Sequence, residues 1–77
     1  MKKVDYTVYE YMKKYIVVVF NNNNFRLNHN QSILTIPNEY SKLIYEILEN
    51  EKTIILNLNH EDRSIRMLCR YMLEQIK

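Results

Sequence analysis

The stretch that decides the fold is Tyr15-Ile16-Val17-Val18-Val19-Phe20, an apolar run that no charged or amide residue interrupts. Valine and isoleucine are β-branched and favour extended backbone. A short apolar run without polar alternation is typical of a strand that is covered on both faces. The sequence therefore predicts a central strand over residues 15–20, with the rest of the chain arranged around it.

Two polar turns follow this strand. Four asparagines occupy positions 21–24, and asparagine both tolerates positive φ and forms local side-chain turns. The chain contains no glycine, so asparagine takes over its role here. Phe20 and Phe25 then bracket a hairpin whose return strand covers residues 25–28, and a second turn leads to a strand over residues 32–36. Together these segments predict a three-stranded meander.

The segment before the central strand has two interpretations. Apolar residues recur at helical spacing from Val4 to Tyr15, and Asp5 is placed to cap a first turn. Val4, Tyr6 and Val8 also alternate as in a strand, among residue types that favour extended structure. A short helix is the preferred prediction, and a strand is the alternative.

The clearest helical pattern comes after Pro37, which ends a strand and suits a first helical turn. Asn38 and Glu39 are a suitable helix start, and Asn50 is a suitable end. Between them the apolar residues recur at i, i+3, i+4, i+7 and i+8, namely Tyr40, Leu43, Ile44, Ile47 and Leu48. A helix facing a core is therefore expected up to Glu49.

Residues 53–58 predict another strand, with Ile54, Leu56 and Leu58 on its better-buried face. A strand, a helix and a strand in close succession predict a right-handed parallel crossover. The last helix is expected to begin at Asn59 and to run almost to Lys77. Its apolar stripe consists of Ile65, Leu68, Cys69, Met72 and Ile76.

These elements predict one small α+β domain over residues 1–77, in the order α-β-β-β-α-β-α. The sheet is expected to be mixed, with about four strands, a three-stranded meander plus a crossover strand, packed by two or three helices. A chain of 77 residues buries only about 60% of the surface that its unfolded form exposes. A partner or a second copy would therefore help to stabilise it, and a homodimer is a reasonable expectation.

The composition argues against several functional classes. Eleven basic residues against nine acidic ones give a net charge of +2, short of the basic excess typical of nucleic-acid-binding domains. The single cysteine, Cys69, excludes an intrachain disulfide and a cysteine-rich zinc site, and it is expected to be buried. His29 and His60 have no nucleophile at a suitable spacing. We expect no metal, no cofactor and no enzymatic activity.

The start of the chain is positively charged but lacks an apolar segment of signal-peptide length, and residues 16–20 are too few to span a bilayer. We therefore expect a cytoplasmic protein without a membrane anchor. Glycine, alanine and tryptophan are absent, whereas residues with AT-rich codons are abundant. Small reading frames of this composition are common in viruses, phages and mobile elements, and in low-GC bacteria or AT-rich protists. The leading hypothesis is a non-enzymatic protein-binding module, such as a viral or phage inhibitor of a host or defence protein.

Tyrosines and lysines in the N-terminal segment form the first candidate surface. Tyrosine adds large rigid area at small entropic cost and is enriched in protein interfaces. The candidate interface residues are Tyr6, Tyr9, Tyr11 and Lys13. Alternatively, Tyr11 and Tyr15 belong to the core and the other tyrosines reflect codon usage.

Arginines on the last helix form the second candidate surface. Arg63, Arg66 and Arg70 occur at i, i+3 and i+7 and so share one helix face, with Lys77 further along. Their planar forks suit phosphate, which favours a nucleic-acid-binding regulator as the alternative function. The competing interpretation is a neutralised solvent-exposed face, in which the i, i+4 pairs Asp62–Arg66 and Arg70–Glu74 form ion pairs.

Overall fold

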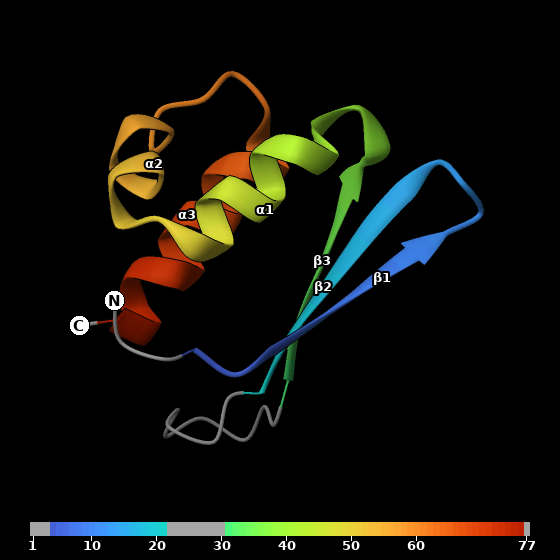
Figure 1. The fold of residues 1–77 in the computed structure, drawn as a ribbon, viewed down its shortest axis with the longest axis horizontal. Coiled ribbons are helices and arrows are strands. Elements are labelled where there is room, and N and C mark those ends of the chain that lie inside the picture. The colour runs from blue at the N-terminus through green and yellow to red at the C-terminus, as the bar shows by residue number, and fades with distance from the viewer. Residues whose placement is uncertain (1–3, 22–30, 77) are drawn as a thin grey trace.

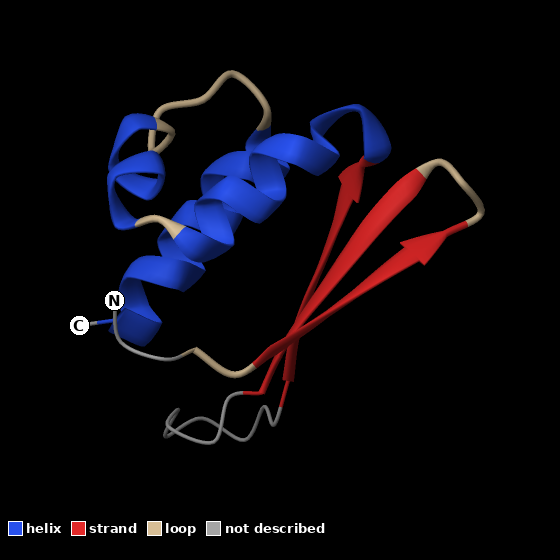
Figure 2. Ribbon diagram, in the orientation of Figure 1, coloured by secondary structure: helices blue, strands red, loops and turns tan. Residues whose placement is uncertain are grey.

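The computed structural model describes residues 4–21 and 31–76, and these form an α+β arrangement of one sheet and three helices (Figures 1 and 2). A short 3-10 helix joins the two parts. The elements in chain order are β1 (Tyr6–Tyr11), β2 (Tyr15–Asn21), β3 (Gln31–Pro37), η1 (Asn38–Tyr40), α1 (Ser41–Glu49), α2 (Glu51–Leu56) and α3 (Arg63–Ile76).

The sheet is antiparallel in the order β1-β2-β3, so β2 is its central strand as predicted. Tyr6 pairs with Phe20 across β1 and β2, and Val18 pairs with Leu34 across β2 and β3. The helices all lie on one side of this sheet (Figure 2). Ile16, Val18 and Phe20 therefore point into a core, whereas Val17 and Val19 stay half-buried on the other face. The expectation that both faces of the central strand are covered is wrong.

The N-terminal segment is a strand, so the preferred prediction of a helix there is wrong. As a strand it pairs with residues 15–20 of β2, because the register runs from Tyr6–Phe20 to Tyr11–Tyr15. Tyr6 and Val8 then pack against the core. A helix over the same residues would leave that edge of β2 unpaired, and unpaired backbone groups are costly when partly buried.

The turn between β1 and β2 uses residues that rarely adopt its backbone conformation. Met12 and Lys13 have φ values of 53° and 55°. The backbone N–H of Lys14 donates to the carbonyl oxygen of Tyr11 at 3.1 Å. Two consecutive residues of positive φ closed by such a hydrogen bond are typical of the type I′ turn, which normally selects asparagine and glycine. The turn therefore holds a methionine and a lysine in a conformation that usually selects asparagine or glycine.

The third strand is present close to where the sequence predicts it, at Gln31–Pro37 against the expected residues 32–36. It pairs directly with β2. The asparagine turn and the return strand expected over residues 25–28 lie outside the described residues.

The prediction of a fourth strand over residues 53–58 is wrong, because α2 and a turn occupy these residues. Asn50 ends α1 as predicted, and its side chain then accepts a hydrogen bond from the backbone N–H of Lys52 at 2.9 Å. This cap starts a new helix at once. Every described strand pairing is antiparallel, so the parallel crossover is also absent from the described residues.

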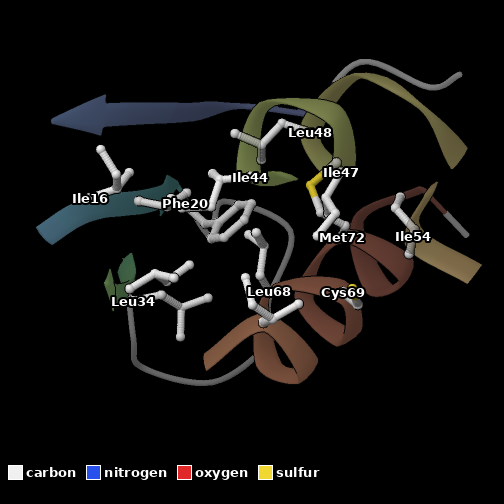
Figure 3. Close-up of a cluster of buried hydrophobic side chains, with 13 residues drawn as sticks. Ile16, Phe20, Leu34, Ile44, Ile47, Leu48, Ile54, Leu68, Cys69 and Met72 are labelled. Carbon is white, nitrogen blue, oxygen red and sulfur yellow. The ribbon is translucent and has the colours of Figure 1, made fainter. Parts of the chain in front are cut away.

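The core lies between the inner face of the sheet and the three helices (Figure 3). Phe20 is 1% exposed. Its ring lies 6.5 Å from that of Tyr6 and 5.9 Å from that of Tyr71. The stripe predicted on the last helix is largely confirmed, since Ile65, Leu68, Cys69 and Met72 are all buried. Phe20 thus joins both hairpin strands to α3.

No helix among the described residues has the length and apolar character needed to cross a membrane.

Candidate functional site

The outer face of the sheet, turned away from the helices, exposes a group of aromatic and apolar side chains. Tyr9 is 56% exposed, Tyr11 is 55% exposed and Ile33 is 60% exposed. The strand registers place the residues of this face side by side. We call it the tyrosine face, and it consists of Thr7, Tyr9, Tyr11, Tyr15, Val17, Val19, Ile33 and Thr35.

The tyrosine face carries no charged side chain at any of these eight positions. Its residues are apolar, aromatic or hydroxyl-bearing, and Val17 and Val19 are half-buried. The largest exposed apolar patch on a soluble protein is often an interaction site. The face can contribute apolar contact area together with hydrogen bonds from the tyrosine hydroxyls.

The structure separates the tyrosines that the sequence groups together. Tyr9 and Tyr11 lie on the tyrosine face, whereas Tyr6 lies on the inner face against Phe20. Lys13 is exposed in the turn between β1 and β2. The alternative that placed Tyr11 and Tyr15 in the core is wrong, because both are exposed.

Sequence reasoning missed Tyr15 and Ile33 as members of this face. The sequence places Tyr15 in the apolar run of the central strand, and Ile33 in the last strand of the predicted three-stranded meander. The signal was available in the strand alternative, in which Val4, Tyr6 and Val8 alternate. With that alternative, Tyr9 and Tyr11 alternate to the face opposite Val8, and the antiparallel register with β2 brings Tyr15 beside Tyr11.

The second surface is a hollow of about 250 Å³ on the solvent side of α3. We call it the arginine hollow, and Arg63, Arg66, Met67 and Arg70 line it. The structure therefore brings together the three arginines that the sequence placed on one helix face. Lys77, the fourth predicted member, lies outside the described residues.

Arg66 is held in a fixed orientation within this hollow. Its Nη1 atom donates to the carbonyl oxygen of His60 at 2.8 Å and to that of Glu61 at 2.9 Å. Both acceptors belong to the loop before α3. The side chain therefore joins the first turn of the helix to that loop, while Nε and Nη2 face no acceptor among the described residues.

The expected neutralisation of the arginines is not seen. In the described part of the chain, no carboxylate lies within ion-pair distance of Arg63, Arg66 or Arg70, so the predicted pairs Asp62–Arg66 and Arg70–Glu74 are wrong. Arg66 uses backbone carbonyls instead, and the Asp62 carboxylate has other partners. The three arginines around the hollow thus have no carboxylate partner in residues 4–21 and 31–76.

Asp62, and not Asn59, caps α3. Its Oδ1 atom accepts hydrogen bonds from the backbone N–H groups of Ser64 at 2.8 Å and Ile65 at 3.3 Å, and from the Ser64 hydroxyl. The Ser64 hydroxyl, followed by these backbone N–H groups, holds the pKa of Asp62 below its ordinary value. The cap fixes where the helix begins, and hence the positions of Arg63 and Arg66.

Replacing Asp62 with alanine is expected to lower the free energy of unfolding by about 1 kcal/mol at pH 7, because the helix loses its cap. A carboxyl whose pKa is lowered by folding stabilises the protein above its unfolded pKa of about 3.9, and this contribution disappears as the pH falls through the folded value. Urea denaturation of wild type and Asp62→Ala at neutral pH and near pH 2.5 should therefore show a difference that shrinks in acid. Asp62→Asn is the control, because it caps without titrating. If Asp62→Ala lowered the free energy of unfolding by the same amount at both pH values, the stabilising role of the ionised Asp62 carboxylate would be contradicted.

His60 and Cys69 have structural surroundings. The Nδ1 atom of His60 accepts a hydrogen bond from the backbone N–H of Asp62 at 3.0 Å, and its ring lies edge-on to Tyr40 at 5.4 Å. Cys69 is buried as predicted, and burial raises the pKa of its thiol to about 11. No group of metal-ligating side chains is found among the described residues.

Comparison of the chain with protein-family models, with curated proteins and with solved structures gives no match. The two surfaces, the tyrosine face and the arginine hollow, are therefore the basis for inferring function.

Proposed function

We propose that the protein is a protein-binding module that uses the tyrosine face, and that this face binds a second copy of the chain. The observation that carries the proposal is the exposure of Tyr9, Tyr11 and Ile33 on a sheet face that none of the described helices covers. Tyrosine is enriched in interfaces because it brings a large rigid ring and a polar tip.

The charge of the face favours a second copy as the partner. A two-fold interface places the same surface on both sides, so a charged patch would meet its own charge. The eight residues of the tyrosine face are all uncharged, and this repulsion is absent. Two antiparallel sheets can pack face to face at about 10 Å, with their side chains interdigitated.

The size of the face sets the expected affinity. Three strands spaced at about 4.8 Å, each contributing about six residues, give a footprint of roughly 300 Å². This is below the ~800 Å² per partner of a standard stable interface. We therefore expect a weak dimer, with a dissociation constant in the micromolar range or above.

Analytical ultracentrifugation over a concentration series from micromolar to near-millimolar tests the proposal. Wild type is expected to shift from monomer to dimer across this range. Each of the variants Tyr9→Ala and Tyr11→Ala should weaken the dimer by about 1 kcal/mol or more per interface tyrosine removed, because each removes a large buried ring. Because both copies in the dimer carry the substitution, its cost to the free energy of dimerisation counts twice.

Two exposed apolar residues of α2 provide the matched control. Ile55 and Leu56 are 54% and 82% exposed and lie outside the tyrosine face, so alanine at either position should leave the dimer unchanged. Tyr6→Ala should lower stability and leave assembly of the folded fraction intact, since Tyr6 lies on the inner face. A wild type that stays monomeric throughout, or a dimer that tolerates both Tyr9→Ala and Tyr11→Ala, would overturn the proposal.

The absence of enzymatic activity and a role as a viral or phage inhibitor stay predictions from composition and motifs. Both are compatible with a protein-binding module, and neither is needed for the dimer experiment.

A further inference from the structure

We propose that the arginine hollow on α3 binds a phosphate group, carried either by a nucleic-acid strand or by a free phosphomonoester such as a mononucleotide. The hollow is a different surface from the tyrosine face and involves none of its residues. The inference therefore stands independently of the proposed function.

The geometry of the hollow suits a small anion with several oxygen atoms. Arg63 and Arg70 are two helical turns apart, roughly 10 Å along the axis, with Arg66 between them. All three line one space of about 250 Å³. A guanidinium group donates two parallel hydrogen bonds in a planar fork, and phosphate offers enough acceptors to meet more than one fork.

Arg66 is prepared for this role by its fixed position. Its Nη1 hydrogen bonds to the carbonyls of His60 and Glu61 hold the group in place before any ligand arrives. Less side-chain entropy is then lost on binding, which favours affinity. The donors on Nε and Nη2 meet no described acceptor and are available to an anion.

The electrostatics of the hollow also favour an anion. Asp62, the residue directly before α3, uses its carboxylate to accept hydrogen bonds from Ser64 and Ile65. The three guanidinium groups have no carboxylate partner among the described residues and repel one another, and a bound phosphate would relieve that repulsion. Met67 contributes the apolar part of the lining, against which a sugar or a base could pack.

Fluorescence anisotropy with labelled single-stranded DNA and RNA of ~12 nucleotides is the primary test. It compares wild type with the double variant Arg63→Ala/Arg70→Ala. Both side chains are exposed on the polar side of α3, so the fold should survive. The variant is expected to bind about tenfold to a hundredfold more weakly, because two charge-assisted contacts are lost. We also compare the slope of log binding constant against log salt concentration between about 50 and 200 mM. For the variant the slope should be smaller in magnitude by about 1.4, because two phosphate contacts are lost at about 0.7 each.

The double variant Lys42→Ala/Lys52→Ala is the matched control. It removes the same charge from exposed positions on α1 and α2, outside the hollow. This control variant should bind the oligonucleotides with almost the affinity of wild type. An equal loss of oligonucleotide affinity in the two double variants would show that binding depends only on the net positive charge of the protein. That result would overturn the proposal.

Two further arms distinguish the sources of the phosphate. Unlabelled mononucleotide and inorganic phosphate are used as competitors, and their effect on the thermal unfolding of wild type is measured. Weak competition beside tight oligonucleotide binding identifies a nucleic-acid strand. A raised melting temperature with mononucleotide or phosphate, lost in Arg63→Ala/Arg70→Ala, identifies a free phosphomonoester. No binding of oligonucleotide, mononucleotide or phosphate at low salt would overturn the proposal. Since none of these measurements reports dimer formation, their failure is distinguishable from failure of the tyrosine-face proposal.

Discussion

Replacing Ile54 with lysine is expected to unfold the protein, whereas replacing Leu56 with lysine should leave it folded. Ile54 is fully buried and Leu56 is 82% exposed. An unpaired charge in the core costs several kcal/mol, a large part of the ~4–12 kcal/mol expected for a domain of this length. At Leu56 a lysine would simply extend into solvent. Circular dichroism with thermal and urea denaturation gives the free energy of unfolding for each variant.

This pair of variants also distinguishes α2 from the strand predicted over residues 53–58. In that strand, Ile54 and Leu56 would share the buried face, and lysine would be damaging at either position. In α2 the two residues are about 200° apart around the helix axis, so only one of them can face the core. Equal destabilisation by Ile54→Lys and Leu56→Lys would contradict the helix.

Replacing Phe20 with alanine is expected to cost about 3–5 kcal/mol, the second of the two largest effects. Phe20 is 1% exposed and contacts the rings of Tyr6 and Tyr71 from β1 and α3. Its removal leaves a cavity where these elements meet, and the surrounding core can collapse only partly. Urea denaturation should show a lower midpoint with a largely unchanged slope.

Ile33→Ala is the control for Phe20→Ala, because Ile33 belongs to the neighbouring strand but points outward and is 60% exposed. It should change stability by less than about 1 kcal/mol, in the range of ordinary surface substitutions. If Phe20→Ala lowered the free energy of unfolding no more than Ile33→Ala does, the core would not be built around Phe20.

Long or unambiguous patterns were predicted correctly from the sequence. The apolar run of β2 identified the central strand, and the stripes of α1 and α3 identified their buried faces. Asn50 was identified as the end of a helix. These segments contain enough residues of one period that no other period accounts for them.

Short segments were predicted wrongly because two periods account for them equally well. Apolar residues at positions 54, 55, 56 and 58 match a strand, yet Ile54 and Leu58 also share a helix face at i, i+4. The strand would bury Leu56 together with Ile54, whereas the helix leaves Leu56 exposed, as observed. In the same way, Val4 and Val8 match a helix, whereas the observed strand packs Tyr6 and Val8, both partly buried, against the core.

The candidate surfaces show the same limit. The shared helix face of Arg63, Arg66 and Arg70 follows from their spacing alone. Whether Asp62 neutralises Arg66 depends on the loop before α3, whose carbonyls bind Arg66 and whose turn leaves Asp62 free to cap the helix. A sequence pattern lists possible partners for a side chain, and competition among those partners is resolved only in the folded chain.

The sequence by itself determined the α+β class, the central strand, the buried stripes of the two long helices and the common face of the three arginines. Each of these follows from local periodicity within one continuous segment. Only the tertiary structure decided that β1 is a strand, that α2 is a helix and that Tyr9, Tyr11 and Tyr15 remain exposed together. Those outcomes depend on backbone pairing with β2 and on the helices covering one face of the sheet, and both are contacts between segments that no local pattern contains.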